Sequence, residues 1–146
     1  MWKSICLALM LFSAQPIQAE DVELYDTDKE RVIQTFANSE KFQQEAADIL
    51  KRVTGRVQEL APSLTKVEIL KIPLAPPREL TVQPGNVQAK VVEMFVVMPK
   101  QGARAPWLIL HTKEHSTILA EFSGSVQSLR DMIKAAPRAD HLQKQQ

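Results

Sequence analysis

Two histidines and a glutamate stand close together in the segment His111-Thr-Lys-Glu114-His115. On a helix, the pattern H-x-x-E-H places both histidines on one face, where they bind zinc in one class of hydrolases. Here the flanking runs 107–110 and 117–119 are rich in branched and aromatic side chains, which favour strands over a helix. The segment is therefore predicted to be the polar tip of a hairpin.

A metal-dependent alternative survives within that hairpin. If the chain turns at Lys113-Glu114, His111 lies opposite Ser116, and the two histidines can approach each other on the sheet with Glu114 or Glu121 nearby. A metal-dependent protein or hydrolase would then use His111, Glu114 and His115.

Other catalytic chemistry finds little support in the sequence. The one cysteine is Cys6, no serine lies in a G-x-S-x-G elbow, and the four glycines form no phosphate-binding loop. We therefore expect no cofactor, and a binding protein rather than an enzyme.

The best candidate binding segment is the loop before one of the predicted strands. It carries Lys100 and Arg104 and ends at Trp107, and tryptophan and arginine are enriched at interface hot spots. The alternative for Trp107 is that it packs into the core as the first residue of its strand.

The first nineteen residues have the pattern of a secretory signal peptide. Lys3 precedes an apolar run at residues 5–14, and Ala19 is a small residue at the expected cleavage site. The run is half the ~20 apolar residues that a membrane-spanning helix needs, so no stable span is expected after cleavage. We therefore expect a secreted or periplasmic protein.

Removal of these 19 of the 146 residues leaves 127, with no cysteine and with 17 basic residues against 17 acidic ones. Zero net charge argues against non-specific binding to nucleic acid. A chain of this length can fold around its own core without disulfides.

The periodicity of the remaining chain predicts an α+β fold, with N-terminal helices (one long), an antiparallel three- to four-stranded meander sheet and a C-terminal helix. The expected order is an acidic flexible arm (20–27), helices at 28–37 and 42–60, strands at 67–72, 87–98, 107–111 and 117–122, a helix at 126–135, and a polar tail (137–146). Residues 79–83 are expected to be either a further short strand or an extended edge. Residues 28–136 are expected to form a single domain.

Three functions are compatible with this sequence. The favoured one is a small exported non-enzymatic binding or protein-interaction domain, whose protein or small-ligand partner is unidentified. The alternatives are the metal-dependent protein above and a structural component of the cell envelope held through its arm and tail.

Overall fold

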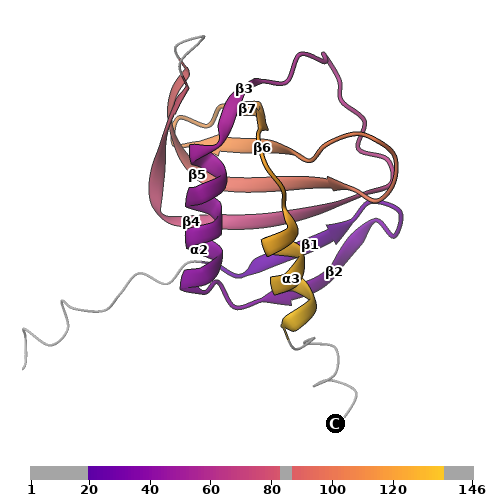
Figure 1. Cartoon of the computed structure of the whole chain (residues 1–146). Helices are drawn as coiled ribbons and strands as arrows, with labels where there is room; N and C mark the ends of the chain where they lie inside the picture. Colours follow the sequence, from indigo (N-terminus) through magenta and orange to yellow (C-terminus); the bar gives the residue numbers. More distant parts are fainter. Residues whose placement is uncertain (1–19, 83–86, 137–146) are drawn as a thin grey trace, which may run out of the picture.

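A computed structural model describes residues 20–82 and 87–136 (Figure 1). The predicted signal peptide (1–19) and polar tail (137–146) lie outside these residues. The described residues form one antiparallel sheet of seven strands, in the order β2-β1-β4-β5-β6-β7-β3, with two short helices. Their bounds are β1 Val22–Asp26, β2 Arg31–Phe36, α2 Glu40–Lys51, β3 Val53–Arg56, β4 Val67–Val82, β5 Val87–Pro99, β6 Trp107–Thr112, β7 Thr117–Phe122 and α3 Gln127–Ala135.

The predicted fold class is wrong. The protein is mostly β, and its N-terminal part contributes three strands and one helix of 12 residues instead of two helices in succession. Both edges of the sheet, β2 and β3, come from this N-terminal part, so the sheet is not a meander of three or four strands. Neither helix of the described residues has the length and apolar content needed to cross a membrane.

The expected acidic arm is strand β1, and the expected helix at 28–37 is a turn followed by strand β2. In β1 the residues alternate, with Val22 and Leu24 buried and Glu23 and Tyr25 half-buried. This period of two is that of a strand with one face in the core. The spacing of the apolar residues in β2 also fits a helix, but the pairing between β1 and β2 slips by one residue near Leu24, which gives β2 an irregular period.

The expected long helix ends at Lys51. The apolar stripe continues through Val53 and Val57, but Val53 and Thr54 are branched and Gly55 weakens a helix by about 1 kcal/mol. Residues 53–56 instead pair with β7 at the far edge of the sheet.

Strand β4 is much longer than expected. It continues through the prolines that were predicted to end it, and its pairing with β5 is interrupted between Pro73 and Arg78. Proline is tolerated there because an irregular stretch of sheet does not need every amide in the ladder.

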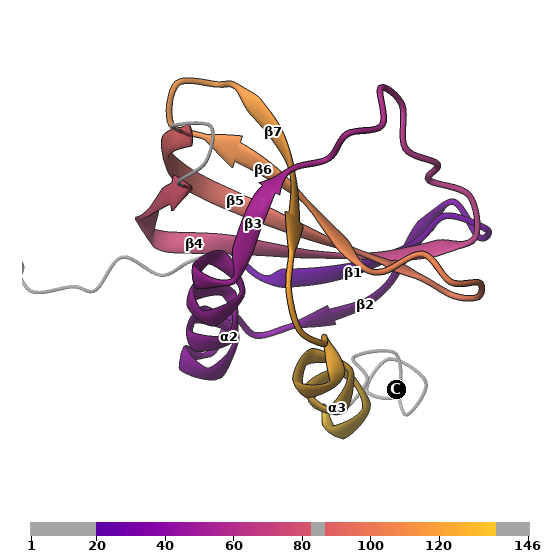
Figure 2. The same cartoon turned by 45° about the horizontal axis from the view of Figure 1, so that its top comes forward.

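Both helices lie on the same side of the sheet (Figure 2). The main core fills the space between them and the inner face of the sheet. Its largest fully buried side chains include Ile49 of α2, Leu129 of α3 and, from the strands, Leu70, Ile72, Met94, Leu108 and Leu110. The outer face of the sheet carries no helix of the described residues.

Candidate functional site

The outer face of the sheet has an apolar hollow near the β2 edge. The register places Tyr25 of β1 beside Val32 of β2 and Ile69 of β4, and places Lys71 of β4 beside Phe95 of β5. Because side chains two apart on a strand share a face, these five side chains lie together on the outer face.

The hollow has a volume of about 250 Å³ and is lined by Tyr25, Val32, Ile69 and Phe95, with Glu23 and Lys71 as its charged lining residues. Val32 is 40% exposed, which makes it one of the large apolar side chains that the fold leaves in contact with solvent. An apolar hollow of this size can hold one or two side chains of a partner.

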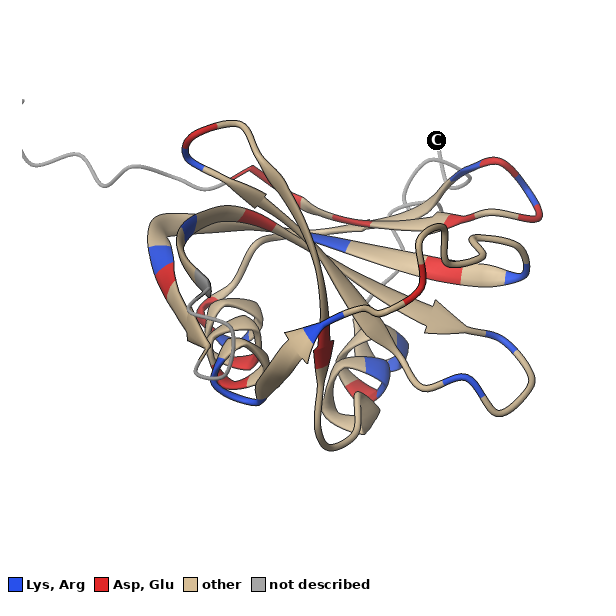
Figure 3. Cartoon of the chain, turned by 90° about the horizontal axis from the view of Figure 1, so that it is seen from above, with Lys and Arg blue, Asp and Glu red and all other residues tan. Residues whose placement is uncertain are grey.

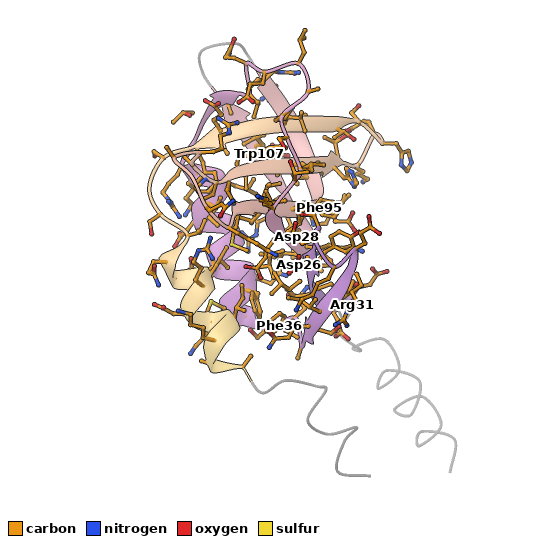
Figure 4. All side chains as sticks on the ribbon, turned by 90° about the vertical axis from the view of Figure 1, so that its right-hand side faces the viewer. Asp26, Asp28, Arg31, Phe36, Phe95 and Trp107 are labelled. Atoms are coloured by element: carbon orange, nitrogen blue, oxygen red, sulfur yellow. The ribbon has the colours of Figure 1, made fainter. Side chains whose placement is uncertain are left out.

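Strand β2 is an edge of the sheet beside this hollow. It pairs with β1, and its other side faces no strand within residues 20–82 and 87–136. Edge strands are usually protected by charged residues or proline. Arg31, its first residue, is the only charged residue of β2 (Figure 4). The opposite edge, β3, has only four residues and ends at Arg56.

A row of polar side chains borders the hollow. Glu93 accepts a hydrogen bond from His111, with 3.0 Å between Oε1 and Nδ1, and lies 3.5 Å from Lys71 Nζ through its other oxygen. The His111 ring also meets the Phe95 ring edge-on, with 4.9 Å between the ring centres. This row fixes the orientation of Phe95 at the side of the hollow. In the view of Figure 3, acidic and basic segments are interspersed over the molecule.

The other half of the outer face is covered by the connection between β3 and β4, residues 57–66. Trp107 is only 2% exposed and packs with Val67 and Val97, against which Val57 and Leu119 also lie. The tryptophan is therefore a core residue under this connection, as the alternative for it anticipated.

Arg104, the second predicted binding residue, lies over the same connection. Its guanidinium is 2.9 Å from Glu59 and 3.8 Å from Glu121, which ties the loop before β6 to residues 57–66. These are exposed ion pairs, which contribute little to stability individually. The structure therefore places Arg104 on the covered half of the face, away from the hollow.

Lys100, the third predicted binding residue, is held by two carboxylates at the end of β1. Its Nζ is 2.7 and 2.8 Å from the two oxygens of Asp26 and 2.9 Å from Asp28. The two aspartates are labelled in Figure 4. Asp26 is almost fully buried and also accepts hydrogen bonds from the backbone amides of Asp28 and Lys29. The cluster closes the β1–β2 turn onto the end of β5.

This pairing changes the pKa of both partners. The hydrogen bond from Lys100 lowers the pKa of Asp26 below its ordinary value of 3.8, against the opposing effect of burial, and the amides of Lys29 and Asp28 lower it further. The hydrogen bonds to Asp26 and then Asp28 raise the pKa of Lys100 above 10.5. Both shifts mean that the folded state favours the charged pair.

Replacing Asp26 with asparagine is expected to change how stability depends on pH. Because the pKa of Asp26 is lowered on folding, its carboxylate stabilises the fold above about pH 3.8, and this contribution is lost as the pH falls through the lower folded-state value. Thermal melting can be measured from neutral pH into acid. The difference in melting temperature between wild type and D26N should be largest at neutral pH and should decrease in acid.

The exposed Asp48 of α2 supplies the matched control, since Asp48→Asn removes a charge without removing this ion pair. If the melting temperatures of D26N and wild type follow the same dependence on pH, the ion pair has no energetic role.

The predicted metal ligands are not brought together. His111 lies on the outer face with Glu93, while Glu114 and His115 are exposed in the β6–β7 turn. The expected register is also wrong: His111 pairs with Thr117, because His115 adopts a left-handed φ of 65° within a wider turn. Over the described ranges, no group of three or more His, Cys, Asp and Glu side chains is arranged to hold a metal ion.

Sequence reasoning missed the hollow. Its residues come from four strands, and two of these strands, β1 and β2, were expected to be an arm and a helix. A signal was present in the alternation of Val22, Leu24 and Asp26 with Glu23 and Tyr25, which has the period of a strand.

Comparison with protein-family models, with curated proteins and with solved structures finds no match to this chain. We therefore base the proposed function on the hollow and the edge strand of the outer face.

Proposed function

We propose that the protein is a small exported, secreted or periplasmic, non-enzymatic binding domain that captures an extended segment of a partner protein by adding it to the sheet at β2. The observation that supports this proposal is the juxtaposition of an edge strand with an apolar hollow, joined by Val32, which belongs to both.

Strand addition uses these two features for different purposes. The unpaired backbone groups of an edge strand give affinity through main-chain hydrogen bonds, and pockets for alternate side chains give specificity. Val32 projects onto the outer face, so alternate side chains of an added strand lie next to it at the rim of the hollow. A partner segment with a long apolar residue at that position fits this arrangement.

The favoured partner chemistry is therefore an extended segment in which apolar residues alternate with polar ones. The charges around the hollow have both signs, with Glu23 and Lys71 in its lining and Glu93 and His111 beside it. A wholly apolar segment is disfavoured, because it removes water from the exposed parts of these groups without replacing the hydrogen bonds to that water.

The test is selection of peptides from a random library displayed on phage, using protein obtained by expressing the full-length chain. We expect enriched peptides with alternating apolar residues that shift the backbone amide NMR signals of β1 and β2. In an added strand, every second backbone amide hydrogen-bonds to the edge strand, and the amides between them point away from it. N-methylation of the first set of amides should therefore abolish binding, and N-methylation of the second set should not.

Val32→Asp is expected to weaken binding of such a peptide by at least about tenfold, because it places a charge in the rim of the hollow. The matched control is Leu60→Asp, which changes an apolar residue that is fully exposed on the covering connection and does not line the hollow. Peptides that bind V32D and wild type equally, or that tolerate N-methylation in both phases, would overturn the proposal.

A further inference from the structure

A second cavity lies on the opposite side of the sheet, between α2 and the irregular part of β4. Figures 1 and 2 show the far end of β4 curving round beside α2. The cleft has a volume of about 590 Å³ and is lined by Ala47, Leu50, Lys51, Pro76, Pro77, Arg78, Glu79 and Thr81. This volume is within the range of pockets that bind small molecules.

We propose that this cleft binds a small organic anion, a molecule with an apolar body and one carboxylate or phosphate group. The proposal is independent of the peptide site, because the two cavities share no lining residue and lie on opposite faces of the sheet.

Arg78 is the residue that points to an anion. Its Nε is buried and has no hydrogen-bond partner among the described residues, and its guanidinium forms no ion pair with any of them. A buried donor without a partner costs about 1–3 kcal/mol. An arginine side chain that lines a cleft offers planar pairs of N–H groups, which match a carboxylate or phosphate.

The other charged groups of the cleft are consistent with this assignment. Lys51 lines the cleft from the last turn of α2 and forms no ion pair within residues 20–82 and 87–136. Among the described residues, Glu79 is the one acidic residue that lines the cleft, and its direct cross-strand neighbour on β5 is Lys90. The described lining of the cleft therefore contains two cationic side chains, Arg78 and Lys51, and one carboxylate, Glu79, which has Lys90 beside it. The charge of the lining favours an anion.

Apolar side chains line the part of the cleft that would contact the apolar body of the ligand. Leu50 belongs to the main core and presents one side to the cleft, and Ala47 lies one turn earlier on α2. Pro76 and Pro77 form the facing side. Proline side chains lose little conformational freedom on binding, so this wall is rigid before a ligand arrives.

A buried glutamine fixes the distance between α2 and this wall. Gln43 donates from Nε2 to the Pro73 carbonyl at 2.8 Å and to Asn38 Oδ1 at 2.7 Å, and it accepts from the Ala75 amide at 3.3 Å. These contacts hold the stretch before Pro76 against the helix. The cleft is thus preformed by polar contacts rather than by closure around a ligand.

The test is titration of the protein with octanoate, octyl phosphate and 1-octanol, which have the same body and differ in the head group. We expect saturable binding of octanoate, octyl phosphate or both, with shifts of the Arg78 Nε–Hε NMR signal and of the backbone amides of Ala47 and Lys51. Of the two anions, the tighter binder identifies the head group. Octanol should bind at least about tenfold more weakly, because it cannot accept the paired hydrogen bonds of the guanidinium.

Arg78→Gln should weaken binding of the anion by at least about tenfold, and Lys51→Gln, at an exposed position that tolerates change, should weaken it to a smaller extent. Arg130→Gln, on α3 and outside the cleft, is the matched control and should bind as wild type does. If R78Q does not fold, K51Q and the Arg78 Nε–Hε signal decide the matter. Absence of saturable binding by both anions, equal binding of octanol, or anion binding that is unchanged in K51Q and in a folded R78Q would overturn the proposal.

Discussion

Replacing Trp107 with alanine is expected to lower the free energy of unfolding by about 3–5 kcal/mol. The side chain is 2% exposed and lies between the sheet and the connection 57–66, where it contacts Val67 and Val97. Truncation removes an indole from a small separate cluster and leaves a cavity that only part of the connection can fill. Urea denaturation monitored by far-ultraviolet circular dichroism measures the change.

The control is Leu60→Ala in the same connection, where the side chain is 103% exposed and a change within about 0.5 kcal/mol is expected. A small effect of W107A would mean that the tryptophan is not packed as the structure shows and is free to serve in binding, as the sequence suggested. A large effect assigns it to the core and leaves the hollow beside β2 as the recognition surface of the outer face.

Replacing Ile49 with alanine is expected to cost about 2–5 kcal/mol of unfolding free energy. Ile49 is fully buried in the main core, in the stripe of buried residues on α2. The cost includes the lost burial of three methyl or methylene groups and the cavity that remains. Ile49→Val should cost only about 0.5–1.5 kcal/mol, because most of the volume is kept.

Gln44→Ala, on the exposed side of the same helix, is the matched control and should change stability by about 0.5 kcal/mol or less. Equal small effects at both positions would mean that α2 does not dock on the sheet. That result would also remove the cleft beside Pro76, since the cleft depends on the position of this helix.

The sequence predicts the C-terminal half of the fold well. The strands at 87–98, 107–111 and 117–122 and the helix at 126–135 agree with β5, β6, β7 and α3 to within a few residues. Here the periodicities of strand and helix differ clearly, and turn residues separate the elements. Local pattern and tertiary structure agree in this half, apart from the register at the β6–β7 turn.

In the N-terminal half, the secondary structure predicted from local periodicity is wrong, and the cause is long-range pairing. Val53 and Val57 continue the helical spacing of α2, but Val53 pairs with Phe122 on a distant strand that the local pattern does not contain. The run before Asp28 is acidic, yet its one buried carboxylate, Asp26, is neutralised by Lys100. In both places a partner more than sixty residues away decides the structure, and composition alone cannot reveal it.

The errors in the predicted binding site have the same cause as the errors in the N-terminal half of the fold. Lys100, Arg104 and Trp107 are chemically suited to binding, but their partners Asp26, Glu59 and Val67 lie in segments whose structure the sequence did not predict. The residues of the hollow are far apart in sequence, and only the register of four strands brings them to one surface.

The strand order also has a consequence for when the fold can form. Both edges of the sheet come from residues before 57, whereas its centre, β4 to β7, spans residues 67–122. As the chain is synthesised from its N-terminus, the β1–β2 hairpin can form locally, but β3 has no strand with which to pair until Phe122 has emerged. Such non-local pairing slows folding, so we expect the β3 edge of the sheet to form only after β7 has been synthesised.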